Sequence, residues 1–116
     1  MFDFEKLDVY QRIRELNVDV LRYLASSPDV DTYLGDQLKR ATLSASLNLA
    51  EGSGRMTKPD KKRFYTVARS SVFESVAILN VLSDLGQIND TLYSNFYDRY
   101  TTVSKMLLAM YRSMTD

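Results

Sequence analysis

The sequence QLKRATLSASLNLAEG, from Gln37 to Gly52, gives a clear helical pattern. Its inward-facing candidates recur at steps of three and four residues, which is the spacing of one helix face. Several of its side chains are small, namely Ala41, Ser44, Ala45 and Ala50. We therefore predict a thin helix that neighbouring helices approach closely and that stops near its closing glycine.

Helical spacing continues on both sides of this stretch. The predicted helices span about residues 4–26, 31–50, 58–85 and 90–113, and Pro28, the Gly52–Gly54 segment and Gly86 separate them. The connections are short, so consecutive helices should be antiparallel. The sequence predicts an all-α fold, an antiparallel up-down-up-down four-helix bundle, in a single domain of residues 1–116.

Four residues mark the predicted helix ends. Asp3 is placed to cap the first helix, and Thr57 is placed to cap the third. Gly52 is expected to close the second helix, and Gly86 should follow the cap of the third. Residues predicted to face the core of the last two helices are Phe64, Val67, Ala68, Ser71, Ile78, Leu82, Leu85, Phe96, Tyr100, Val103, Leu107 and Met110.

The composition excludes several classes of chemistry. The chain has no cysteine and no histidine, so it can build neither a thiolate nucleophile nor a Ser-His-Asp triad. A zinc site of cysteine and histidine is excluded as well. There is no apolar run long enough to span a membrane, and the acidic start does not resemble a signal peptide. We expect a cytoplasmic protein that is not an enzyme and uses no cofactor.

Charge is concentrated in one segment of a chain whose net charge is zero. Residues 55–69 hold six basic and one acidic side chain, a balance of +5. Cations on one helix face can contact phosphates, and an aromatic among them can stack on a base. The alternative to a binding site is an ordinary solvated helix face. The predicted nucleic-acid-binding residues are Arg55, Lys58, Lys61, Lys62, Tyr65 and Arg69.

Polar residues near the end of the second helix have two interpretations. Asn48, Glu51, Arg69 and Glu74 would form either a hydrogen-bonded network that ties the second helix to the third, or a small polar site. The structural network is the preferred interpretation. Glu51 opposes the helix dipole at a C-terminus, so it should have a basic partner, either Arg55 or Arg69. Glu51 and Glu74 would be the carboxylates of an acid–base pair only if a cleft brought them together.

The fourth helix carries a second stripe beside its core stripe. It consists of Tyr93, Tyr97, Leu108 and Tyr111. These residues would either widen the contact within the bundle or form a subunit interface, where aromatic residues are enriched.

Three motifs carry a resemblance to a known family. Gln37-Leu38-Lys39-Arg40-Ala41 runs on to Asn48-Leu49-Ala50-Glu51-Gly52; Arg63-Phe64 is followed by Ala68-Arg69-Ser70-Ser71 and Glu74; and the chain opens with Phe4-Glu5-Lys6-Leu7-Asp8-Val9-Tyr10. Together they resemble the bacterial four-helix-bundle family associated with intervening sequences in large-subunit ribosomal RNA genes. Ser70 departs from the family pattern, which usually has glycine there.

This resemblance implies an antiparallel four-helix bundle that assembles as a ring-like homo-oligomer, with a pentamer favoured. The family is similar in turn to the accessory protein of diversity-generating retroelements, which binds a reverse transcriptase and nucleic acid. We therefore expect a non-enzymatic oligomeric module whose partners are RNA or DNA, or a nucleic-acid enzyme. The alternatives are a structural scaffold, or a small-molecule binder or enzyme that uses the polar groups near Glu51.

Overall fold

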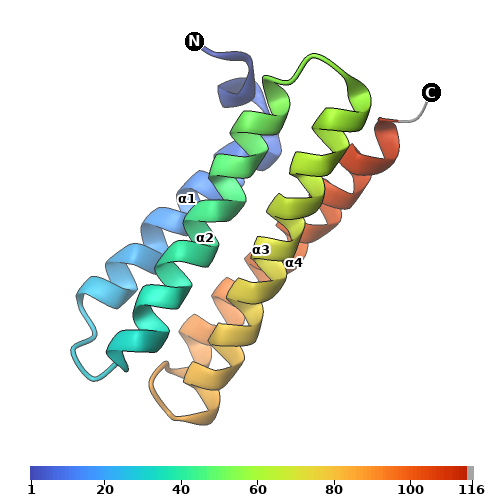
Figure 1. Cartoon of the computed structure of the whole chain (residues 1–116). Helices are drawn as coiled ribbons and strands as arrows, with labels where there is room; N and C mark the ends of the chain where they lie inside the picture. Colours follow the sequence, from blue (N-terminus) through green and yellow to red (C-terminus); the bar gives the residue numbers. More distant parts are fainter. Residues whose placement is uncertain (115–116) are drawn as a thin grey trace.

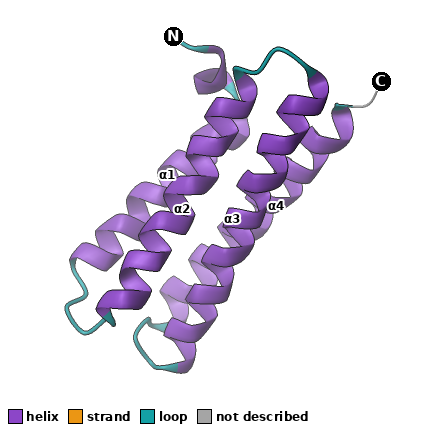
Figure 2. Ribbon diagram, in the orientation of Figure 1, coloured by secondary structure: helices purple, strands orange, loops and turns teal. Residues whose placement is uncertain are grey.

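The computed structural model describes residues 1–114 and shows four long antiparallel helices. A short 3-10 turn, η1 (Asp3–Lys6), precedes α1 (Asp8–Ala25), α2 (Thr32–Ser53), α3 (Lys58–Asp84) and α4 (Asp90–Ser113). The helices alternate in direction, and the N-terminus and the last turn of α4 lie at the same end as the α2–α3 loop (Figure 1). The bundle measures 47 × 25 × 22 Å, and no strand is present in the described residues (Figure 2). The predicted fold is confirmed.

Side chains at three of the helix starts explain where those helices begin. Asp31 accepts a hydrogen bond from the backbone N–H of Leu34 at 2.9 Å, and Asn89 accepts one from Leu92 at 2.8 Å. The predicted cap at Thr57 is confirmed, because its hydroxyl accepts from the N–H of Asp60 at 3.3 Å. Each of these bonds satisfies a backbone donor that the first helical turn leaves unpaired.

The predicted start of the first helix is wrong. Asp3 does not cap a helix; it begins the separate turn η1, and the extended backbone of Leu7 interrupts the chain before α1 starts at Asp8. This break allows the ring of Phe4 to pack edge-on against Tyr10, with 4.9 Å between ring centroids. The contact covers apolar surface of both rings.

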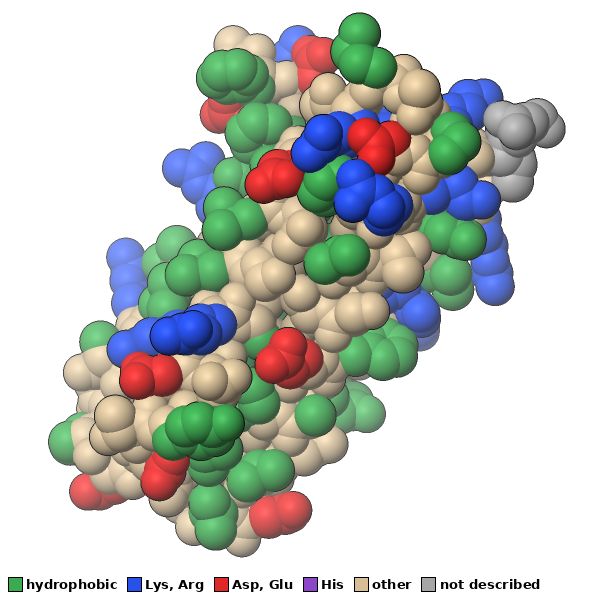
Figure 3. Space-filling view, in the orientation of Figure 1, with side chains coloured by type: hydrophobic (Ala, Val, Ile, Leu, Met, Phe, Trp, Pro, Cys, Tyr) green, Lys and Arg blue, Asp and Glu red, His purple; other side chains and the backbone are tan. Residues whose placement is uncertain are grey.

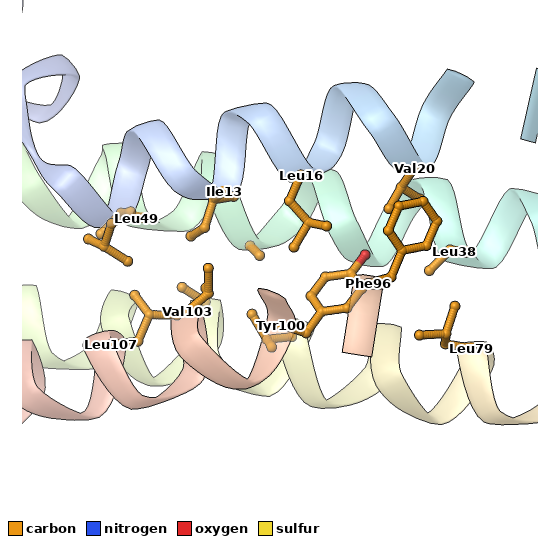
Figure 4. Packing of buried hydrophobic residues seen from close by; sticks show 14 of the residues in the cluster. Ile13, Leu16, Val20, Leu38, Leu49, Leu79, Phe96, Tyr100, Val103 and Leu107 are labelled. Carbon is orange, nitrogen blue, oxygen red and sulfur yellow. The ribbon is translucent and has the colours of Figure 1, made fainter. Parts of the chain in front are cut away.

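The core is a continuous apolar column between the four helices. Its largest fully buried side chains include Ile13 and Leu16 of α1, Leu38 of α2, Leu79 of α3 and Tyr100 of α4. These residues point toward one another from all four helices (Figure 4). Along α4 the predicted core stripe is confirmed from Phe96 to Leu107, and Met110 is partly buried.

Two of the core predictions for α3 are wrong. Val67 is 43% exposed and Leu85 is 56% exposed, whereas Tyr65, Val72 and Leu79 are buried. Successive residues of a helix are rotated by about 100°, so the neighbour of a buried position can face solvent. Val67 precedes the fully buried Ala68 and lies outside the stripe that the bundle covers.

The prediction that Gly52 stops α2 is wrong, because Gly52 lies within the last turn of that helix. The helix continues to Ser53, and Gly52 is buried. A Cβ atom at this position would be 2.7 Å from the Cβ of Phe64 and 3.0 Å from the ring of Tyr65. The glycine therefore permits α2 and α3 to approach each other where the loop joins them. Gly86 has a φ of 69°, which confirms it as the residue after the cap of α3.

A chain of buried hydrogen bonds crosses the core. Thr42 donates its hydroxyl proton to Asn17 Oδ1 at 2.5 Å. Because a hydroxyl has only one proton, Tyr100 is the donor in the 2.8 Å hydrogen bond between its hydroxyl and that of Thr42. Asn17 Nδ2 then donates to Ser46 Oγ at 3.0 Å, and Ser46 donates to the carbonyl of Leu43. Burial raises the pKa of Tyr100 to about 12, which keeps the donating hydroxyl protonated.

Gly52→Ala should destabilise the protein, because the added methyl group would collide with Phe64 and force α2 and α3 apart. We expect a loss of about 1–3 kcal/mol in the free energy of unfolding, measured by urea titration. Gly35→Ala is the matched control: a Cβ there meets its nearest atom, in Val30, at 3.6 Å. That substitution should be neutral or stabilise by up to about 1 kcal/mol. Equal losses in both variants would contradict the close approach at Gly52.

Thr42→Val should destabilise the bundle by about 1–3 kcal/mol, because it leaves Tyr100 and Asn17 without their shared hydroxyl. Tyr100→Phe removes the donor at the other end of one bond. We expect the double variant to lose less than the sum of the two single losses, by at least about 0.5 kcal/mol. The measurement is urea unfolding of all four proteins, and strictly additive losses would show that the two side chains are not coupled.

Candidate nucleic-acid interface

The basic segment lies at the end of the bundle where α2 turns into α3. Figure 3 shows lysine and arginine side chains gathered there and along the edge of α4. Arg55 lies 3.7 Å from Glu51 and 3.7 Å from Asp60, and its guanidinium is 4.4 Å above the centre of the Phe64 ring. Of the two basic partners predicted for Glu51, Arg55 is therefore the one that contacts it. The ion pair is exposed, so it adds little stability.

Two further cations of the segment are engaged within the chain. Lys61 donates to the carbonyl of Ser53 at 2.7 Å, which places a positive charge at the negative end of the α2 dipole. Arg63 pairs with Asp60 at 2.7 Å and lies over the Phe64 ring. These contacts fix the loop between the helices. Lys58 is exposed at the first position of α3.

Lys62 and Arg69 point instead toward α4. The ammonium group of Lys62 is 4.5 Å from the centre of the Tyr111 ring. Arg69 donates to the carbonyl of Ser104 at 3.3 Å, and its guanidinium is 4.6 Å above the Phe73 ring. Arg69 is thus a link between α3 and α4 and does not pair with Glu51.

Tyr65 cannot stack on a base, contrary to the prediction. Its side chain is only 3% exposed and packs in the core beside Gly52. Burial also raises its pKa above the ordinary tyrosine value. The helical spacing places Tyr65 on the inner margin of the basic face, where the glycine leaves room for its ring. Two exposed aromatic residues, Phe73 and Tyr97, line one groove with Arg69, and sequence reasoning did not connect them with the basic segment.

Charge is divided along the α3–α4 hairpin. Residues 61–73 and 99–114 contain seven lysines and arginines and no aspartate or glutamate. Residues 70–98 contain four acidic side chains and no basic one. Because α3 and α4 are antiparallel, the two acid-free segments lie side by side near the α2–α3 loop (Figure 1). We call Lys62, Arg69, Lys105 and Arg112 the basic strip. Arg99 faces α1, where it pairs with Asp19 at 2.9 Å.

The predicted polar network forms only in part. Asn48 donates to both the carbonyl and the hydroxyl of Ser44, and Ser71 of α3 donates to the same hydroxyl at 2.9 Å. This connection ties α2 to α3 as expected. Glu74 is exposed and makes no hydrogen bond or ion pair within residues 1–114. Glu51 shares no partner with it, so the structure gives no support to an acid–base pair.

The second stripe of α4 faces α3. The hydroxyl of Tyr93 donates to Asn80 Oδ1 at 2.6 Å, and Leu108 is partly buried. The ring of Tyr111 lies against the ammonium group of Lys62. The stripe therefore widens the contact between the two helices, which was one of its two interpretations. Tyr97 and Tyr111 are 41% and 38% exposed, and their role in a subunit interface stays a prediction.

No group of three or more acidic side chains in residues 1–114 is arranged to hold a metal ion. None of the helices in the same range is both long and apolar enough to cross a bilayer.

Comparisons with known proteins agree with this architecture. This chain is similar to the crystal structure of a protein of unknown function from the S23 ribosomal protein family of Bacteroides thetaiotaomicron. The TM-score between the two structures is 0.82. The two chains are 18% identical over 89% of this chain and 97% of the other, so the likeness concerns the fold alone. No curated protein matches the sequence. The model of the 23S rRNA-intervening sequence protein family matches residues 5–109. The chain therefore belongs to the 23S rRNA-intervening sequence protein family.

Proposed function

We propose that this protein is a non-enzymatic, oligomeric module that binds nucleic acid through phosphate contacts of the basic strip. One observation carries the proposal: the four cations of the basic strip lie on two adjacent helix segments, residues 61–73 and 99–114, that contain no aspartate or glutamate. A carboxylate within these segments would neutralise part of the strip's positive electrostatic potential, and neither segment contains one. Because the whole chain has a net charge of zero, the positive potential of this surface comes from where the charges lie and not from an excess of basic residues.

The strip has the geometry of a linear phosphate track. Lys62 and Arg69 are seven residues apart on α3, and Lys105 and Arg112 are seven residues apart on α4, so each pair spans about 10 Å. Lys62 and Arg69 are held in place by Tyr111, Phe73 and the Ser104 carbonyl. Held side chains lose less conformational entropy when a ligand binds, which favours affinity.

Self-association would strengthen such a surface. The family resemblance implies a homo-oligomer, with a pentamer favoured, and a ring would repeat the basic strip around its axis. Several weak contacts on one strand then act together through a raised effective concentration. The same repeated surface would suit a nucleic-acid enzyme that carries its own RNA or DNA. The absence of cysteine fits a cytoplasmic setting.

The non-enzymatic part of the proposal rests on the side chains that the sequence lacks. Without histidine or cysteine, the chain has no side chain that ordinarily titrates near neutral pH. The carboxylates singled out in the sequence, Glu51 and Glu74, do not meet. An interaction role therefore accounts for the described surface better than catalysis does.

The proposal is tested by the binding of a fluorescein-labelled RNA of mixed sequence, followed by anisotropy at several salt concentrations. We expect the affinity to fall with salt, with a slope in log–log form of up to about −3 per protomer for four phosphate contacts. Lys62→Glu combined with Arg112→Glu should lower the affinity at least about tenfold at low salt.

The matched control is Lys39→Glu combined with Arg40→Glu, which makes the same charge change at exposed positions of α2. It should weaken binding far less than the strip variant. Thermal unfolding and light scattering of each variant verify that the fold and the assembled mass are retained. An affinity independent of salt, or equal losses in the two variants, would contradict a localised strip.

A further inference from the structure

We propose that the groove between α3 and α4 is a base-stacking site, which makes the basic strip prefer single-stranded over double-stranded nucleic acid. This inference rests on the proposed function and names the class of nucleic acid. The groove has a volume of about 430 Å³ and adjoins the strip, because Arg69 and Lys105 are among its lining residues. Val72 and Val76 contribute apolar surface to it, and Phe73 and Tyr97 line it from opposite helices.

Two of the aromatic side chains that line the groove are partly exposed to solvent. Phe73 is 54% exposed and Tyr97 is 41% exposed, although both are large apolar side chains. Exposed rings beside a track of cations are the arrangement that proteins use to bind single strands, because every base has a π-face that can stack. These residues take the role that the sequence had given to Tyr65.

Arg69 joins the cationic and aromatic parts of this surface. Its guanidinium lies 4.6 Å above the centre of the Phe73 ring and is held there by the carbonyl of Ser104. A planar guanidinium can stack on a base as an aromatic ring does, while its charge attracts the adjoining phosphate. A base in the groove would therefore have a layered platform of Phe73 and Arg69 beside it.

The charges around the groove suit a polyanion. Its lining includes Arg69 and Lys105 and contains no aspartate or glutamate. Asn80 lines the groove as well and accepts the hydroxyl proton of Tyr93 on its oxygen, so its amide nitrogen remains as a donor in this region. A base edge presents acceptors that such a donor can bind.

The preference for single strands follows from which surfaces a duplex exposes. Its phosphates remain accessible, but its bases are already stacked on one another and their faces are covered. Contacts to phosphate alone would bind both forms, whereas contacts to ring faces require an unpaired base. The groove thus adds an interaction that only a single strand can make.

The test uses the full chain and two probes: a labelled 20-nucleotide RNA of mixed sequence, and the same strand annealed to its complement. We expect the native protein to bind the single strand at least about tenfold more tightly than the duplex. Phe73→Leu combined with Tyr97→Leu should remove most of this difference, because it weakens single-strand binding far more than duplex binding, whose salt dependence should persist. Leucine keeps the surface apolar, and both positions are exposed, so the fold should be retained.

The matched control makes the same chemical change elsewhere, with Phe2→Leu combined with Tyr33→Leu, both highly exposed. It should bind both probes as the native protein does. Salt-dependent binding of both probes with equal affinity would overturn the stacking site and leave the strip standing. Failure of both probes to show salt-dependent binding would overturn the proposed function itself. A change of mass by light scattering in the groove variant would overturn the inference by showing that a second copy occupies the groove.

Discussion

A chain of buried hydrogen bonds from Tyr100 through Thr42 and Asn17 to Ser46 sets the alignment of the helices that it joins. It joins α4, α2 and α1 inside a core that is otherwise largely apolar. Apolar side chains pack acceptably in several registers, but a buried hydroxyl or amide without a partner costs about 1–3 kcal/mol. Shifting one helix along another would leave several of these groups unsatisfied at once. The chain therefore selects one alignment of the helices.

Gly52 provides the corresponding constraint for α3. Its missing side chain lets Phe64 and Tyr65 lie against the last turn of α2, at the end of the bundle where the loop turns back. Once α3 is placed there, its basic first half lies beside the second half of α4, which also carries basic residues and no acidic one. The division of charge along the hairpin is thus a consequence of how the core is aligned. The Arg69 contacts to Ser104 and Phe73 then hold part of the strip in position.

Much of the fold could be predicted from the sequence because its signals are local. The cap at Thr57, the left-handed Gly86 and the bounds of α4 each depend on a few adjacent residues. The buried chain could not be predicted, because Asn17 and Thr42 are ordinary polar residues whose pairing depends on packing of distant segments. Gly52 misled the prediction for a related reason: a glycine at a helix end and one at a helix crossing have the same local sequence.

The candidate site was predictable in its charge and not in its geometry. Counting charges located the basic segment, but only the fold shows that it continues across α4 to Lys105 and Arg112. Helical spacing also assigned Tyr65 to the exposed face, whereas its ring fills the core. The aromatic residues that do reach solvent, Phe73 and Tyr97, lie on different helices and are 24 residues apart in the sequence. Tertiary contact between α3 and α4 brings them to one groove.

In the proposed function, the halves of α3 and α4 that lie beside the α2–α3 loop form the surface that binds nucleic acid. The most direct measurement is an NMR titration of the ¹⁵N-labelled protein with a short single-stranded RNA, which follows every backbone amide. We expect the shifted amides to cluster in residues 61–80 and 97–112, with α1 and the first half of α2 unchanged. Shifts concentrated on α1 or α2, or an absence of shifts at saturating RNA, would contradict the account.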